Sequence, residues 1–353
     1  MSGNFLPNTK LATIVQSEDA IFTYAQSYYG QILEVQGKLV GTPKIYTRTG
    51  DVKTVSTTDL ELTAKKFTPL AAVFTRDWKT STDRRYVFYL DDSNRLCDAY
   101  YDTNWHKGSL SDQNWVAAHY SSLAAIQQTP TVGANFVDAN SISLYYQNTS
   151  ESGDIVEVSY SRGRWTVGPP PINDPPLFGT SLSVVAPEAG IQSKVSTNNM
   201  APVVFFQYDR LGLGSSQDLG GDDYNAYHIP QHDSALSAHT SIAAVDDGIN
   251  CYVFYTSDDN NVQRVRVDST GLVCSTTVVP LSPRATPRSS LSAVMFSDTA
   301  KETVVLFHLQ HWTPDLKTTE SHHIYATTLN RESTATASVD IWDVSTMVRI
   351  TRG

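Results

Sequence analysis

Six short apolar runs recur along this chain at nearly even intervals. Each run starts with Leu or Ile, continues with Ala or Ser and ends with Ile or Val, and the runs begin at residues 11, 70, 123, 182, 242 and 291. The spacings between their first residues are 59, 53, 59, 60 and 49. A repeat of this period, built on strand-forming residues, is the sequence signature of a β-propeller in which each repeat forms one blade.

The second residue of every run is small, which predicts the place of these strands in the fold. A strand that lies where several blades converge on an axis has no room there for a bulky side chain. Each run is followed by a second strand rich in aromatic and β-branched residues, such as 86–89, 142–146, 203–206, 252–255 and 304–307. No sustained helical period competes with these strands. We therefore predict an all-β fold, a six-bladed β-propeller.

The length of 353 residues fits one domain, because radially repeated β architectures reach this size as a single unit. With 40% hydrophobic and 18% charged residues, the chain has enough apolar material for a core. We predict a single domain over residues 1–353. Its blades are expected at 8–60, 67–118, 120–172, 178–233, 238–282 and 288–350.

Two connections depart from this regularity. Residues 169–176 contain five prolines, which lack the backbone donor that a central strand needs, and they predict a stiff link between the third and fourth blades. Residues 208–234 are punctuated by glycine and are expected to form a long connection that carries Tyr227, His228 and His232. Long loops on a rigid scaffold often carry function.

Charge and cysteine content restrict the partners and the compartment. A net charge of −10 with no cluster of Lys and Arg argues against nucleic acid as a partner. No stretch is apolar enough for a membrane span, and the first residues do not resemble a secretory signal. Cys97, Cys251 and Cys274 form an odd set without metal-ligand spacing, and the first two are expected as buried thiols. We expect a cytoplasmic protein.

Motifs for cofactors and metals are missing from the sequence. There is no phosphate-binding loop, zinc-binding histidine pair or nucleophile elbow. His322 and His323 are neighbours on an expected strand, so they face opposite sides and cannot chelate one ion. The pair Asp246-Asp247 lacks the spaced oxygen ligands of a calcium site. His308 ends an apolar strand and is expected in the core. We predict neither a metal nor a cofactor.

The third repeat carries a recognisable set of strands. Residues 142–147 read Ile-Ser-Leu-Tyr-Tyr-Gln, 155–157 read Ile-Val-Glu, and 165–168 read Trp-Thr-Val-Gly. This arrangement resembles a blade of the fungal fucose-specific lectins. The resemblance implies a six-bladed propeller in which an Arg of the second strand, a Glu of the third strand and a following aromatic residue hold the sugar. Such groups suit sugar hydroxyls and an apolar sugar face.

The sugar-binding pattern of that family is incomplete in this chain. The position of the arginine is taken by Phe22, Tyr86, Ser143, Tyr252 and Val305. The glutamate remains at Glu34 and Glu157, and the other blades carry Asp98, Arg264 and Ala326 instead. A sugar hydroxyl that loses its charged partner on burial costs roughly 1–3 kcal/mol. The resemblance therefore supports the fold more than it supports fucose binding.

Unusual residues gather in loops that a propeller places on one face. Loops from second to third strand and from fourth to next first strand share this face, and they are expected to form an aromatic-walled small-molecule pocket. The side chains expected there are Tyr208, Arg210, Tyr227, His232, His239, Gln310, His311 and Trp312. Residues 76–78, which read Arg-Asp-Trp, and the pair Arg84-Arg85 are expected in a first-to-second-strand loop on the opposite face, where the expected role is a surface charge pair.

Two classes of function follow from these features. The first is similar to the propeller hetero-Diels-Alderases of fungal tropolone-sesquiterpenoid biosynthesis, which join a tropolone quinone methide to a sesquiterpene such as humulene. Such a pericyclase needs orientation of two apolar partners, which can lower a barrier by roughly 7–11 kcal/mol, and no cofactor. The catalytic residues would be His232 and His311 as acid or base and Arg210 as a charge stabiliser.

In this interpretation Tyr208, Tyr227, His239, Gln310 and Trp312 bind the substrate. The alternative is a lectin-like propeller that binds fucose or another glycan without catalysis. The expected partner is accordingly a small apolar metabolite or a sugar, and a homodimer is compatible with both. We favour the enzyme on sequence grounds, because five expected arginines are absent while the loops of one face are rich in aromatic residues and histidine.

Overall fold

The computed structural model describes residues 5–6, 8–56, 64–77, 82–127, 141–168, 175–185, 202–218, 224–229, 236–247, 250–268, 273–279, 289–297, 301–312, 321–332 and 343–350. For some strand residues, among them 224–228, 310–312 and 321–323, only the backbone is described. The described strands form six antiparallel sheets, in which four strands are hydrogen-bonded in sequence order, and the first sheet has a short fifth strand that pairs with its third. The predicted all-β, six-bladed propeller is confirmed.

The first three blades have the following strands. Blade 1 contains β1 (Ala12–Ser17), β2 (Ala20–Gln26), β3 (Ile32–Val40), β4 (Ile45–Arg48) and β5 (Lys53–Thr54). Blade 2 contains β6 (Ala71–Asp77), β7 (Thr82–Leu90), β8 (Leu96–Tyr101) and β9 (Trp105–Lys107), followed by a short 3₁₀ helix, η1 (Leu110–Gln113). Blade 3 contains β10 (Leu123–Gln127), β11 (Ile142–Gln147), β12 (Ile155–Ser161) and β13 (Arg164–Val167).

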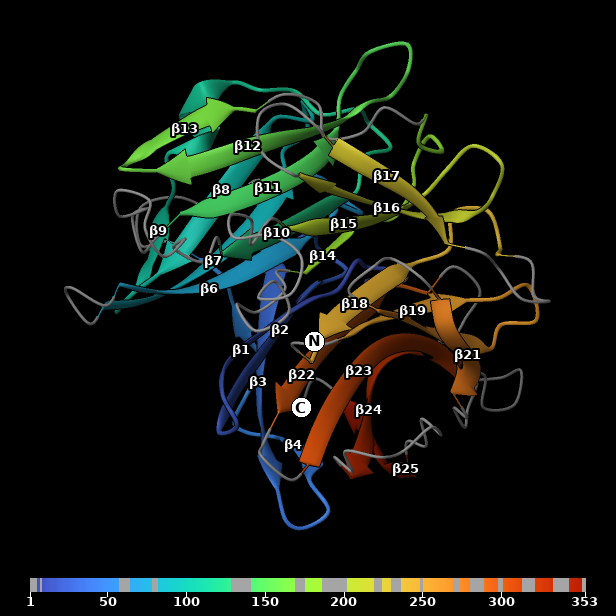
Figure 1. Ribbon diagram of the computed structural model, residues 1–353. Helices are drawn as coiled ribbons and strands as arrows, with labels where there is room; N and C mark the ends of the chain where they lie inside the picture. Colours follow the sequence, from blue (N-terminus) through green and yellow to red (C-terminus); the bar gives the residue numbers. More distant parts are fainter. Residues whose placement is uncertain are drawn as a thin grey trace.

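The last three blades repeat this order. Blade 4 contains β14 (Ser183–Val185), β15 (Val203–Gln207), β16 (Leu213–Asp218) and β17 (Tyr224–Ile229). Blade 5 contains β18 (Ile242–Asp246), β19 (Asn250–Thr256), β20 (Val262–Asp268) and β21 (Val273–Val279). Blade 6 contains β22 (Leu291–Ser297), β23 (Lys301–Trp312), β24 (Ser321–Glu332) and β25 (Asp343–Ile350). Figure 1 shows these sheets following one another around the molecule, from blue to red.

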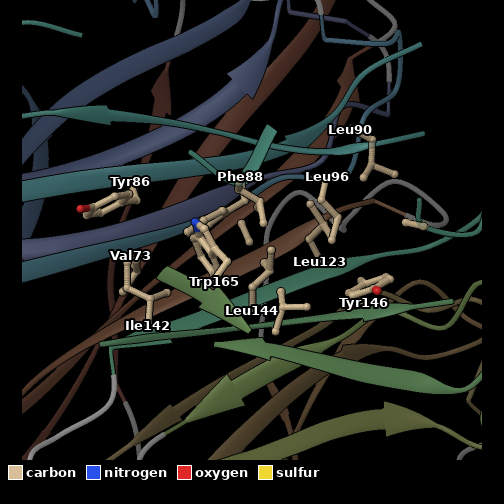
Figure 2. Packing of buried hydrophobic residues seen from close by; sticks show 14 of the residues in the cluster. Val73, Tyr86, Phe88, Leu90, Leu96, Leu123, Ile142, Leu144, Tyr146 and Trp165 are labelled. Carbon is tan, nitrogen blue, oxygen red and sulfur yellow. The ribbon is translucent and has the colours of Figure 1, made fainter. Parts of the chain in front are cut away.

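The core is divided among the interfaces between neighbouring blades. Six clusters of buried residues are present in the described part of the chain, one for each pair of adjacent blades, including the pair formed by blades 6 and 1. Figure 2 shows the cluster between blades 2 and 3, where Phe88 and Trp165 meet edge to face with ring centroids 6.0 Å apart. Strand residues alternate between the two neighbouring interfaces, because successive side chains point to opposite faces of a sheet.

The ring closes through contacts between the last and first blades. The backbone N–H of Leu11 donates to Ser290 Oγ at 2.9 Å, which joins the two inner strands. Further out, the backbone N–H of Tyr46 donates to Thr328 Oγ1 at 3.1 Å, and the ring of Tyr46 meets Phe307 edge to face. These contacts and the cluster of buried residues shared by blades 6 and 1 hold the ring closed.

A hydroxyl group before each inner strand fastens it to the second strand of the same blade. In all six blades this hydroxyl oxygen accepts a backbone N–H of the second strand, at 2.6–2.9 Å. The donor is the last residue of that strand in blades 1 to 5 and Leu309 in blade 6. The hydroxyls belong to Thr9, Thr68, Ser121, Thr180, Thr240 and Ser289. Because this bond recurs at the same place in every blade, it identifies equivalent positions in the six blades.

Buried glutamines tie three blades to the turn that leads into the next blade. Gln147 donates from Nε2 to the carbonyls of Gly153 and Leu177, and its Oε1 accepts the N–H of Gly179. Gln26 and Gln207 make equivalent bonds in blades 1 and 4. These side chains satisfy backbone groups that the change of direction between blades would leave unpaired.

One sequence prediction about the architecture was wrong. The stretch 208–234 is not one long connection, because it contains strands β16 and β17 paired over six residues. No sequence signal indicates β16, because Gly214, Ser215 and Ser216 are neither β-branched nor aromatic. These residues nevertheless lie buried in the blade. Packing against the neighbouring strands thus decides the conformation here, and local propensity does not.

Candidate functional site

The interface between blades 1 and 2 brings together a carboxylate, a guanidinium and several aromatic rings. Glu34 of β3 accepts a hydrogen bond from the hydroxyl of Tyr24 at 3.0 Å and forms an ion pair with Arg85 of β7 at 3.2 Å. The guanidinium carbon of Arg85 lies 4.0 Å from the ring centre of Phe22 and 4.1 Å from that of Tyr101. We call these five residues the Glu34–Arg85 cluster.

The pairing of strands explains how the cluster forms. Tyr24 and Glu34 are direct partners in the β2–β3 ladder, so their side chains lie side by side on the face of blade 1 that meets blade 2. Arg85 and Tyr101 are direct partners in the β7–β8 ladder and face blade 1. Packing the two blades together places the charge of one against the charge of the other.

Burial strengthens the electrostatics of this cluster. The side chains of Glu34 and Arg85 are only 6% and 12% exposed, so their attraction is screened less than that of a surface pair. Burial, reinforced by the charge of Glu34, raises the pKa of Tyr24 well above its usual value. The phenol therefore stays protonated and donates to the carboxylate. Arg85 also stacks on aromatic faces, which favours a guanidinium over an ammonium.

The position of Arg85 corrects a sequence expectation. We expected Arg84 and Arg85 in a first-to-second-strand loop on the opposite face, but both lie within β7. The strand begins at Thr82, four residues before its apolar stretch, and the strand pleat then sends the two side chains to opposite faces. Arg84 lies over the ring of Tyr100, 5.3 Å from its centre. The surface pair on this blade is instead formed by Arg76 and Asp83.

The corresponding positions of blades 2 and 3 are occupied by internal contacts. Glu157 accepts hydrogen bonds from Ser143 Oγ at 2.5 Å and Ser159 Oγ at 2.8 Å. Asp98 accepts the backbone N–H of Leu110 at 2.9 Å, and burial raises its pKa to about 7. Each carboxyl group is thus held by its own blade and faces no guanidinium among the described residues.

Blade 5 reverses the charge of this position. Arg264 stands where blade 1 has Glu34, lies almost fully buried, and has its guanidinium carbon 5.7 Å from the ring centre of Tyr252. The hydroxyl of Tyr252 donates to Asp247 at 2.8 Å. Blade 5 thus carries a guanidinium at the position where blade 1 carries a carboxylate.

Three of the residues expected in a loop pocket have described side chains, and they lie in two different turns. Tyr208 begins the turn between β15 and β16, where its ring packs beside Gly212 and a buried cluster, and Arg210 is exposed in the same turn. His239 has a left-handed backbone with φ of 60°, and its backbone N–H donates to Gln207 Oε1. Its ring nitrogen Nδ1 lies 3.4 Å from the carbonyl oxygen of Gly179. His239 thus belongs to the turn that leads into blade 5.

Five expected site residues lie outside the described side chains. His232 falls outside the described residues altogether, and only the backbone is described for Tyr227, Gln310, His311 and Trp312. Tyr227 lies in β17 opposite Ser215, which differs from the loop expected for it. Gln310, His311 and Trp312 extend β23 and pair with His323, His322 and Ser321. Their assignment to a site stays a prediction.

Other expectations for single residues can be compared with the structure. Cys97 and Cys251 are buried free thiols, as expected. His308 is fully buried, in agreement with its expected place in the core, and β23 continues beyond it to Trp312. Among the described residues, no group of His, Cys, Asp and Glu could hold a metal ion. In the same part of the chain, no helix has the length and hydropathy needed to cross a membrane.

The axis of the propeller is hollow and widens toward one end. A cavity of about 120 Å³ lies among the first residues of the six inner strands, where Ala and Ser keep the walls small. A second cavity of about 420 Å³ lies toward the ends of the same strands. The wide end is on the face opposite the loops that we expected to form a pocket, because inner strands run from the fourth-to-first-strand loops toward the first-to-second-strand loops.

The fold and the interface cluster together define a propeller lectin scaffold. The family model of the fungal fucose-specific lectins matches residues 6–285, so this chain belongs to that family. The fucose-specific lectin of Aleuria aurantia is 26% identical over 188 residues, which is 52% of each chain. The alignment thus spans about half the length of that curated relative.

Solved structures of related lectins share the whole architecture. AofleA of Arthrobotrys oligospora matches with a TM-score of 0.71 and 18% identity over 100% of this chain and 89% of its own. A crystal structure of the Aleuria aurantia lectin, described as a six-bladed β-propeller with a novel fucose recognition mode, matches with a TM-score of 0.69 and 19% identity. That match covers 98% of this chain and 97% of the lectin. At these identities the matches establish the fold.

Proposed function

We propose that this chain is a lectin-like protein that binds a fucose-type sugar at the Glu34–Arg85 cluster. The carboxylate of Glu34 accepts hydrogen bonds from sugar hydroxyls, and the guanidinium of Arg85 donates to them. The ring of Phe22 is buried beneath the guanidinium, and the partly exposed ring of Tyr101 offers a flat surface to the apolar face of the sugar. The observation that carries the proposal is the 3.2 Å ion pair between Glu34 and Arg85, whose guanidinium contacts two aromatic rings. It brings together the carboxylate, the guanidinium and the aromatic groups that such a site needs.

The arginine of this site comes from the neighbouring blade. The family's own arginine position is Phe22, and Arg85 brings the missing charge from across the interface. The names of the relatives support the choice of sugar, because the Aleuria aurantia protein is a fucose-specific lectin. We expect one sugar per chain, since blades 2, 3 and 5 use the corresponding positions for internal contacts and blades 4 and 6 carry Ser215 and Ala326 there.

The proposal is tested by titrating the protein with methyl α-L-fucoside in a calorimeter. We expect saturable binding with one site per chain, and galactose serves as the sugar control. Glu34→Gln should weaken binding by about tenfold or more, equivalent to at least about 1.4 kcal/mol. The matched control is Glu157→Gln, which changes the same group in blade 3 and should leave binding unchanged. Absence of saturable binding, or equal effects of the two variants, contradicts the proposal.

A second candidate function is the cycloaddition expected from the sequence. The observation that favours it is the wide axial cavity, whose lining is mostly apolar. Orientation of two apolar partners in such a chamber accelerates a reaction without a nucleophile or metal. Of the expected catalytic residues, only Arg210 has a described side chain, and it is exposed in a turn.

The cycloaddition is tested by incubating the protein with humulene and a hydroxymethyl tropolone. The enzyme hypothesis predicts adducts of defined stereochemistry, formed faster than in buffer alone. A product mixture identical to that of the uncatalysed reaction contradicts it. The result is independent of fucoside binding, because the axial cavity and the Glu34–Arg85 cluster have no residue in common.

A further inference from the structure

The wide axial cavity has the size and lining of a small-molecule site. Its volume of about 420 Å³ lies within the roughly 300–1,000 Å³ range of ligand pockets. Eleven of its fourteen lining residues are apolar, and all six inner strands contribute to it. It adjoins the narrow cavity, since Thr13, Ala72 and Ala125 line both. A ligand can therefore enter from the wide end and is stopped by the small, closely packed residues of the narrow end.

The sixfold repeat of the inner strands is broken at this cavity. The first four residues of each run are similar in every blade, as in Leu-Ala-Ala-Val of blade 2 and Ile-Ala-Ala-Val of blade 5. The fifth residues differ, and those that line the cavity are Val15, Phe74, Gln127, Asp246 and Met295. All five are partly exposed, as expected at an open mouth. Val15, Phe74 and Met295 also pack at their inner sides against the buried clusters between blades, so these three residues serve the fold as well as the cavity wall.

The five residues divide the mouth into an apolar side and a polar side. Met295, Val15 and Phe74 come from blades 6, 1 and 2, which are consecutive around the ring. Gln127 and Asp246 come from blades 3 and 5 on the other side of the axis. Such an arrangement orients a ligand that has one apolar side and one polar group.

The polar side of the mouth determines which polar group a ligand can carry there. The carboxylate of Asp246 lines the cavity and accepts the thiol hydrogen of Cys251 at 3.3 Å, and a carboxylate can accept more than one hydrogen bond. Its negative charge, together with the net charge of −10, disfavours an anionic ligand. We propose that the wide axial cavity binds a small apolar molecule that carries one hydrogen-bond donor group, a hydroxyl or an amine, beside Asp246. This proposal is independent of sugar binding at the Glu34–Arg85 cluster.

The proposal is tested with three probes that share one C10 chain and differ in the polar group. Geraniol, geranylamine and geranic acid are titrated into the protein by calorimetry. We expect geraniol and geranylamine to bind with one site per chain and geranic acid to bind at least about tenfold more weakly, equivalent to about 1.4 kcal/mol. Equal binding of all three probes, or none, overturns the proposal.

Two variants and one control variant locate the site. Val15→Trp fills the apolar side of the mouth and should abolish binding, and Val167→Trp makes the same change at an exposed position of β13 and should not. Asp246→Asn removes the charge and should bring geranic acid to within about threefold of geraniol, a change of about 0.7 kcal/mol. A thermal melt shows that each variant is folded. If Val167→Trp weakens binding as much as Val15→Trp does, or if Asp246→Asn leaves the preference unchanged, the site is not in this cavity.

Discussion

Arg85 of the second blade reaches across the blade interface to within 3.2 Å of Glu34 in the first blade, and both side chains are nearly buried. The same blade carries a second arginine with a carboxylate partner, since Arg76 Nε lies 2.8 Å from Asp83 in an exposed position. The two pairs have similar chemistry and differ in their contact with water. They therefore allow a direct comparison of what burial does to an ion pair.

Arg85→Met should lower the free energy of unfolding by roughly 3 kcal/mol. It leaves the Glu34 carboxylate buried with only the hydroxyl of Tyr24 as a charge-stabilising partner, and breaking a buried pair is costly for this reason. Arg76→Met is the matched control and should change stability by less than about 1 kcal/mol, because exposed pairs contribute little. Urea unfolding monitored by tryptophan fluorescence measures both. Similar losses in the two variants would show that burial does not govern the energy of the Glu34–Arg85 pair.

Asp98→Asn should stabilise the protein at neutral and alkaline pH. Because burial raises the folded-state pKa of Asp98 from 3.8 to about 7, the folded protein keeps a proton that the unfolded chain releases. The contribution of this group to stability therefore falls as pH rises from about 4 to 7, by at most about 1.4 kcal/mol per pH unit. The amide keeps the bond from Leu110 and does not ionise.

Urea unfolding between pH 4.5 and pH 8 measures this effect. The difference between Asp98→Asn and the unaltered protein should grow with pH up to about 7 and then stay constant. Asp51→Asn is a suitable control, since Asp51 is exposed and lies in another blade. A difference that does not depend on pH means that Asp98 is ionised in the folded protein throughout this range.

His308→Phe should make the stability of the protein less sensitive to acid. Burial lowers the pKa of His308 from 6.5 to about 4, so the unfolded chain takes up a proton before the folded protein does. Its contribution to stability falls as pH decreases from about 6.5 to 4, which is opposite in sign to that of Asp98. Phenylalanine preserves the stacking on Tyr325, whose ring centre is 5.7 Å away. Thermal melts at pH 4.5, 5.5, 6.5 and 7.5 should show a variant less sensitive to acid, and an unchanged sensitivity would contradict this assignment.

Gln147→Leu should loosen the connection between blades 3 and 4. It removes the partners of two carbonyls and of the Gly179 N–H, and each buried polar group left without a partner costs roughly 1–3 kcal/mol. We expect a lower melting temperature and faster hydrogen exchange of the Gly179 amide. The amide of Thr256, in another blade, should exchange as before at temperatures well below the melt. Unchanged exchange at Gly179 would mean that the glutamine does not hold this turn.

The fold could be predicted from the sequence because it rests on a local pattern that is repeated six times. A small residue at the second position of each inner strand and a hydroxyl before it recur in every blade, and the structure gives each a role at the axis or in a hydrogen bond. The outer strands were harder to predict. Gly214 and Ser215 form a strand in the fourth blade only because neighbouring strands satisfy their backbone groups.

The candidate sites could not be predicted in the same way. Glu34 and Arg85 are about fifty residues apart in the sequence, and only the packing of two blades brings their charges together. Val15, Phe74, Gln127, Asp246 and Met295 are similarly dispersed, and they meet because the inner strands surround one axis. The amino-acid sequence by itself determined the number of blades, the order of strands and the loss of the family's arginines. Tertiary structure alone decided which side chains from different blades share an interface, because contacts between repeats depend on how the repeats close into a ring.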